Sequence, residues 1–114
     1  MEMTASEVSG ALIVKVGENR IDAAVAVRFK DQMRELTEHP SNRIILDLSR
    51  VEFVDSSGLG AIVGSMKQLG RGRKLDLAGM TQTVDKVFRM TRMDSVFRIY
   101  EDIEHAFQDI AHAS

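Results

Sequence analysis

The residues best suited to chemistry lie in one short stretch, Asp55-Ser56-Ser57-Gly58-Leu59-Gly60. Apolar residues typical of a buried strand precede this stretch, and apolar residues at helical spacing follow it. We therefore expect it to lie where a strand passes directly into a helix. The first turn of a helix has unpaired N–H donors and a partial positive charge, so small polar side chains and anions are favoured there.

Two interpretations of this stretch remain open. Asp55 or Ser56 could serve only as an N-cap, with a side chain that accepts a hydrogen bond from a backbone N–H of the first turn. Capping does not explain Gly58, Gly60 and Gly64, because a glycine inside a helix is less favourable than alanine by up to roughly 1 kcal/mol. The glycines indicate that something approaches the helix closely, which is either the sheet beneath it or a partner protein.

Composition and charge exclude several classes of function. The chain has 114 residues, with 44% hydrophobic residues, 28% charged residues, no cysteine and a formal net charge of −2. These values favour one soluble domain over residues 1–114 and exclude disulfides and thiolate chemistry. No apolar stretch is long enough for a membrane span or a signal peptide, so we expect a cytoplasmic protein with no membrane partner.

A nucleic-acid partner is also not expected, because the weakly acidic chain lacks a general attraction to phosphate backbones. The one basic cluster, at Arg71, Arg73 and Lys74, has no interleaved aromatic residues for base stacking and is predicted to be a solvated turn. The three histidines lack the spacing of metal ligands, so no metal site is predicted. No cofactor is expected either.

The pattern of apolar residues predicts strands that alternate with helices. Strands are expected at residues 12–16, 44–48, 75–77 and 96–100, with a weaker one at 6–8. Helices are expected at residues 25–36, 59–69, 84–91 and 103–110, the first of them with Asp22 as a plausible N-cap. Such alternation implies crossover connections. The predicted class is therefore α/β, with a four- to five-stranded mixed sheet and about four helices packed against it.

A few residues outside the main stretch also carry expectations. Asp47 and Asp76 interrupt strand-like runs and are predicted near the solvated end of the sheet, with no role assigned. Met80, Met90 and Met93 could form an adaptable contact surface, but methionine more often fills gaps in a core, and we favour the core interpretation.

Several segments together match a known family signature. They are Ile44-Ile45-Leu46-Asp47-Leu48-Ser49 continuing through Val51 and Phe53 to Gly60, then Arg20-Ile21-Asp22-Ala23-Ala24, and Leu77-Ala78-Gly79-Met80 followed by residues 84–97. Taken together, with residues 20–24 before the Asp55 segment and residues 77–97 after it, they resemble the STAS domain, named for sulfate transporters and anti-sigma factor antagonists. The resemblance covers nearly the whole chain and implies a STAS-like fold. Asn19 and Arg92 depart from it, since each stands where relatives often have glycine.

The resemblance implies a regulatory protein with no enzymatic activity. In the family, the unphosphorylated antagonist binds an anti-sigma factor serine kinase of the histidine-kinase-like ATPase fold and thereby releases the sigma factor. Phosphorylation ends the binding, and a serine phosphatase reverses it. Carried over to this chain, the phosphoacceptor is Ser56, with Ser57 the less favoured candidate. The implied partner-binding residues are Asp22, Asp55, Ser56, Ser57, Gly58, Leu59 and Gly60.

Such a switch has a simple electrostatic basis. A phosphate adds about −1.5 to −2 charge beside Asp55, which a helix N-terminus tolerates but a closely packed interface does not. Asp22 is implied to help the kinase engage, although it could equally be a helix cap. The main alternative function is an unphosphorylated STAS scaffold subunit of a transporter or stress-sensing complex. A nucleotide-binding enzyme is disfavoured because the Walker lysine is missing.

Overall fold

The computed structural model describes the backbone of residues 1–113 and the side chains of residues 1–108. The strands are β1 Met3–Val8, β2 Ala11–Val16, β3 Arg20–Ile21, β4 Arg43–Asp47, β5 Phe53–Val54, β6 Lys74–Ala78 and β7 Ile99–Tyr100. The helices are α1 Ala26–Leu36, α2 Ser56–Leu69, α3 Gln82–Met90 and α4 Ile103–Ala113, with a short 3₁₀ turn at Met93–Ser95. The predicted apolar position Ile110 lies outside the described side chains.

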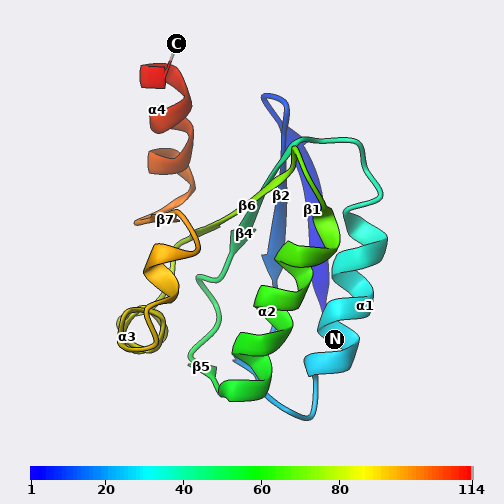
Figure 1. Ribbon diagram of the computed structural model, residues 1–114, viewed down its shortest axis with the longest axis vertical. Coiled ribbons are helices and arrows are strands. Elements are labelled where there is room, and N and C mark those ends of the chain that lie inside the picture. Colours follow the sequence, from blue (N-terminus) through cyan, green and yellow to red (C-terminus); the bar gives the residue numbers. More distant parts are fainter. Residues whose placement is uncertain (114) are drawn as a thin grey trace.

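Five of the strands form one mixed sheet in the order β1-β2-β4-β6-β7 (Figure 1). β1 pairs with β2 in antiparallel fashion, and every other pairing in this sheet is parallel. Helices connect the parallel strands, as crossover connections require. The prediction of an α/β class with a four- to five-stranded mixed sheet and about four helices is therefore confirmed.

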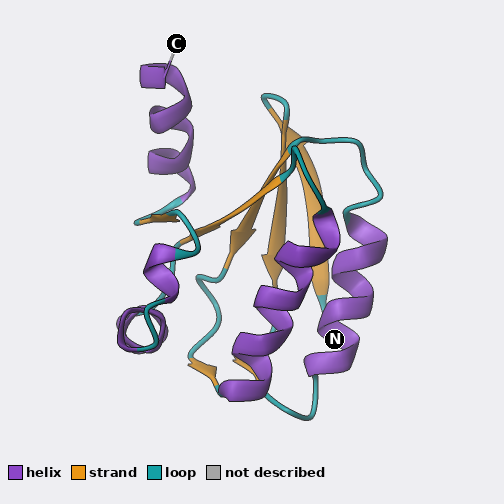
Figure 2. Ribbon diagram, in the orientation of Figure 1, coloured by secondary structure: helices purple, strands orange, loops and turns teal. Residues whose placement is uncertain are grey.

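Alternate residues of a strand point to opposite sides of a sheet. Since β4 has apolar residues on both sides, helices cover both faces of this sheet. On one face, Ile44 and Leu46 of β4 join a large core with α1, α2 and α3. On the other face, Ile45 packs in a small cluster with Ala106 of α4. In Figure 2, α1 and α2 lie side by side in front of the sheet and α4 lies apart from them.

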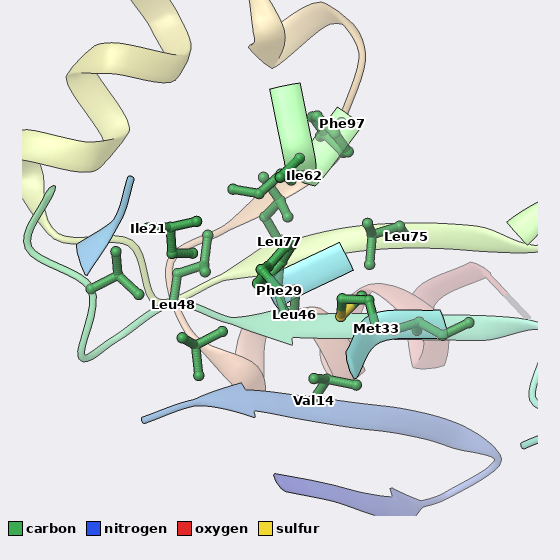
Figure 3. Packing of buried hydrophobic residues seen from close by; sticks show 14 of the residues in the cluster. Val14, Ile21, Phe29, Met33, Leu46, Leu48, Ile62, Leu75, Leu77 and Phe97 are labelled. Atoms are coloured by element: carbon green, nitrogen blue, oxygen red, sulfur yellow. The ribbon is translucent and has the colours of Figure 1, made fainter. Parts of the chain in front are cut away.

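A second, two-stranded sheet was not predicted. β3 and β5 pair in parallel, with Arg20 opposite Phe53 and Ile21 opposite Val54. Two residues are too few to show the alternation by which strands are recognised in a sequence. Ile21 is fully buried in the main core, together with Phe29 of α1 and Ile62 of α2 (Figure 3). The small sheet therefore fixes the chain just before two turns, the one at Asp22 and the one at Asp55.

The predicted strand at residues 96–100 is wrong for most of its length. Only Ile99–Tyr100 pair with the sheet, and a 3₁₀ turn precedes them. Phe97 turns into the core instead, where the centroid of its ring lies 6.1 Å from that of the Phe88 ring in an edge-to-face arrangement. Arg92 opens the 3₁₀ turn with φ 63° and ψ 21°. Glycine adopts this left-handed conformation without the steric cost that the arginine side chain incurs here.

The prediction that Asp76 lies near the solvated end of the sheet is wrong. Asp76 is 4% exposed, and its carboxylate accepts a 2.8 Å hydrogen bond from Nε of Arg43. Arg43 also donates to the carbonyl oxygen of Ala106 at 3.0 Å. Through Arg43, α4 is therefore attached to the face of the sheet opposite α1 and α2. In the predicted solvated turn, Arg71 and Lys74 are exposed, whereas Arg73 is half-buried and donates to the carbonyl oxygens of Ser41 and His39.

The core interpretation of the methionines holds only in part. Met80 and Met93 are partly buried and pack against the main core. Met90, at the last position of α3, is 74% exposed and fills no gap in that core.

Candidate functional site

The start of α2 is built around the carboxylate of Asp55. Asp55 is the N-cap, and its Oδ1 accepts a 2.8 Å hydrogen bond from the backbone N–H of Gly58. Ser56 and Ser57 follow as the first two residues of the helix, and both are exposed. The capping interpretation is therefore correct for Asp55, and it leaves both serine side chains facing solvent.

The second oxygen of the same carboxylate reaches across to the chain before α1. Oδ2 of Asp55 accepts a 3.1 Å hydrogen bond from the backbone N–H of Ala23, 32 residues earlier in the sequence. The backbone N–H of Asp55 donates to the carbonyl oxygen of Ile21 at 3.4 Å. Figure 1 shows the resulting arrangement, with the start of α2, β5 and the turn before α1 at one end of the molecule.

These contacts lower the pKa of the Asp55 carboxyl from its ordinary value of 3.8. The hydrogen bond from Gly58 has the largest effect; partial desolvation opposes it, and the N–H groups of Ala23 and Ser57 and the positive charge of Arg20 act in the same direction as Gly58. The three N–H groups and the charge of Arg20 all favour the ionised carboxylate. Asp55 is therefore an anion at neutral pH, with both oxygens engaged by the backbone.

Asp22 lies in the turn that Asp55 holds, but it does not cap α1. The helix begins at Ala26, and Val25 occupies the N-cap position without a side-chain hydrogen bond. Asp22 instead accepts a 3.1 Å hydrogen bond from the N–H of Ala24 and a 3.2 Å hydrogen bond from Nε of Arg20. It therefore stabilises the turn that leads into the helix.

The three glycines of α2 have different explanations. A Cβ at Gly58 would overlap the carbonyl oxygen of Ile21 and lie 2.7 Å from its carbonyl carbon. A Cβ at Gly64 would meet the flexible end of Lys30 at 3.1 Å. A Cβ at Gly60 would meet nothing within 4 Å. Close packing on β3 explains Gly58, whereas nothing inside the described part of the molecule explains Gly60.

The remaining predicted site residue, Leu59, is half-buried and packs against the main core. Arg20 and Phe53 belong to the segments that resemble the family, but no role was predicted for either; the structure brings them together beside the site. The guanidinium of Arg20 lies 4.7 Å from the ring centroid of Phe53. The resemblance places both residues in matching segments, but the two strands that pair them are too short to be recognised from the sequence.

The rest of the described chain offers no stronger candidate for chemistry. No group of three or more potential metal ligands was found among the described residues. Within that same part of the chain, none of the helices combines the length and the apolar character needed to cross a membrane. A half-open hollow of about 260 Å³ lies between α3 and β7, but two of its lining residues, Asp85 and Arg89, bind each other at 2.8 Å.

Residues 2–106 match the STAS domain family, and the chain therefore belongs to that family. The crystal structure of TM1081 from Thermotoga maritima, described as an anti-sigma factor antagonist, has 27% sequence identity and a TM-score of 0.82, and the match covers 96% of this chain and 94% of that one. A sulfate transporter family protein from Wolinella succinogenes has 19% identity and a TM-score of 0.76, covering 94% and 91% of the two chains. The latter likeness concerns the fold alone.

Curated relatives of this chain also carry the antagonist name. A Thermotoga maritima protein named as an anti-sigma factor antagonist is 34% identical over 70 residues, which are 60% of this chain. The match spans only 62% of that relative's length. The anti-sigma-B factor antagonist of Staphylococcus aureus is 26% identical over 92 residues, covering 80% of this chain and 84% of the relative.

Proposed function

We propose that this chain is an anti-sigma factor antagonist that acts by partner switching. The unphosphorylated form binds an anti-sigma factor serine kinase of the histidine-kinase-like ATPase fold and thereby frees the sigma factor. Phosphorylation of Ser56 abolishes this binding, and a serine phosphatase restores it. The chain has no catalytic activity of its own. The partner surface comprises the turn at Asp22 and the start of α2, from Asp55 to Gly60.

One observation carries the proposal: Ser56 is an exposed hydroxyl at the first position of α2, in a chain whose curated relatives are named antagonists. A kinase can reach such a hydroxyl without unfolding the domain. The phosphate would then lie at the N-terminus of a 14-residue helix, which stabilises anions. The phosphorylated protein should therefore remain folded.

Binding responds differently to the same modification. A phosphate buried in an interface loses its hydration next to the ionised Asp55, and an unpaired buried charge costs several kcal/mol. Since each 1.4 kcal/mol changes an affinity tenfold, even part of this penalty is a sufficient switch.

The test is phosphorylation by the cognate kinase. The purified chain is incubated with that kinase and ATP, and the modified residue is mapped by mass spectrometry. We expect labelling of Ser56 in the wild-type chain and in Ser57→Ala, and none in Ser56→Ala. Labelling of Ser57 in the Ser56→Ala protein would assign the phosphorylation site to Ser57 instead of Ser56. Absence of labelling in all three proteins would refute the phosphorylation switch.

A phosphomimetic variant tests the consequence for binding. Ser56→Asp should keep the circular dichroism spectrum and thermal midpoint of the wild type, yet bind the kinase about tenfold or more weakly. Undiminished affinity in a folded Ser56→Asp protein would contradict the proposal.

The alternative is an unphosphorylated scaffold subunit of a transporter or stress-sensing complex. The Wolinella succinogenes protein, described as a member of the sulfate transporter family, has the same fold, so this fold also occurs in that family. The two proposals differ in the proteins that co-purify from cells. Recovery of transporter subunits without an anti-sigma kinase would favour the scaffold.

A further inference from the structure

The small β3–β5 sheet presents an arginine stacked on an exposed aromatic ring. Arg20 and Phe53 are opposite each other in the pairing of the two strands. The guanidinium lies 4.7 Å from the ring centroid, and 41% of Phe53 remains exposed. The Arg20 side chain is itself 58% exposed. Both groups are therefore accessible to a partner, although aromatic residues are normally buried.

The guanidinium is also held in a defined orientation. Its Nε donates to Oδ2 of Asp22 at 3.2 Å, and the other oxygen of Asp22 is fixed by the backbone N–H of Ala24. This arrangement uses only one edge of the guanidinium. In the described part of the chain we find no hydrogen-bond acceptor for its two terminal nitrogens. They remain available as a pair of parallel donors.

The arginine is continuous with the surface that carries Ser56. Phe53 precedes Ser56 by three residues, and Ile21, which follows Arg20, lies directly against Gly58 of α2. The positive charge of Arg20 contributes to the lowered pKa of Asp55, which is consistent with this proximity. A protein that covers Ser56 would therefore reach Arg20 and Phe53 as well.

We propose that Arg20, stacked on Phe53, is the anchor that binds a carboxylate side chain of the anti-sigma factor. This inference rests on the function proposed above. A guanidinium with two free parallel donors matches the planar geometry of an aspartate or glutamate. Arginine and aromatic residues dominate the energetics of protein interfaces. The stacking and the Asp22 contact hold the guanidinium before binding, which reduces the entropy lost on association.

The anchor gives the switch a second physical basis. A phosphate on Ser56 would place up to two negative charges near the bound carboxylate and would repel it. The same phosphate would also attract the guanidinium away from that carboxylate, because arginine binds phosphate as well as carboxylate. Both effects release the partner without any change of fold.

The test compares arginine variants in binding to the purified cognate anti-sigma kinase, measured by calorimetry with the unphosphorylated chain. We expect Arg20→Ala to weaken binding about tenfold or more. Arg20→Lys should recover only part of the affinity, because lysine lacks the paired donors. Arg34→Ala is the matched control, because the Arg34 side chain is similarly exposed, at 62%. Arg34 lies in the last turn of α1, roughly 12 Å from the start of that helix. The affinity of this variant should equal that of the wild type.

The role of the ring is tested by Phe53→Leu, which keeps an apolar side chain but removes the stacking surface. We expect this variant to weaken binding less than Arg20→Ala. Circular dichroism of each variant checks the fold, and the Arg20 variants decide the question if Phe53→Leu does not fold.

The outcomes separate the two proposals. If the wild-type chain does not bind the kinase, the proposed function fails and the anchor fails with it. If the wild type binds and Arg20→Ala binds equally well, the anchor is refuted while the proposed function stands. Full affinity in Arg20→Lys would refute recognition through paired donors.

Discussion

Replacement of Gly60 by alanine is expected to stabilise the fold and to weaken binding to the anti-sigma factor. Gly60 lies one helical turn after Ser56, and a side chain there would meet nothing within 4 Å. Alanine is more favourable than glycine inside a helix by about 0.5–1 kcal/mol. Since the new methyl group displaces no neighbour, Gly60→Ala should increase the free energy of unfolding by this amount. For a domain of this size, 1 kcal/mol raises the thermal midpoint by roughly 4 °C.

The same methyl group should disturb the complex. If the anti-sigma factor packs closely on the start of α2, an added methyl group overfills the interface, which typically costs about 1–3 kcal/mol. The affinity of Gly60→Ala should then fall at least about fivefold. A gain in stability together with a loss of binding would indicate that the partner approaches the backbone closely at Gly60.

Urea denaturation and calorimetric titration with the cognate kinase measure the two effects. Gly58→Ala is the control, because its Cβ would overlap the carbonyl oxygen of Ile21 and should lower the stability instead. A Gly60→Ala protein that is less stable than the wild type would show that an internal constraint had been missed. A more stable protein with unchanged affinity would remove Gly60 from the proposed partner surface.

Two further predictions concern the charges that hold the fold together. Asp55→Ala should lower the free energy of unfolding near neutral pH, since it removes the bonds to Gly58 and Ala23. Because the folded pKa of Asp55 lies below 3.8, its contribution is complete above that value and is lost as the pH falls through the folded pKa; urea titrations of wild type and variant should therefore converge in acid and not at neutral pH. Asp76→Ala should cost about 3 kcal/mol in the same assay, because it leaves Arg43 largely buried without its carboxylate, and a cost below about 1 kcal/mol would contradict the importance of this pair.

The sequence by itself determined the fold class and the position of the candidate site. Apolar residues at periods of two and about 3.6 reveal strands and helices that are long enough to repeat the pattern, such as β4 and α2. The Asp55 cap was also readable, because capping depends on residues within three positions of each other. The family signature surrounding Ser56 is equally local in sequence.

Only the tertiary structure decided how distant segments meet. The bond from Ala23 to Asp55, the stacking of Arg20 on Phe53 and the ion pair between Arg43 and Asp76 all join residues about 30 positions apart. Gly58 and Gly60 look alike in the sequence, and only the position of the Ile21 carbonyl distinguishes them. Local periodicity encodes which face of an element is apolar, whereas the neighbour across that face is set by the packing of the whole chain.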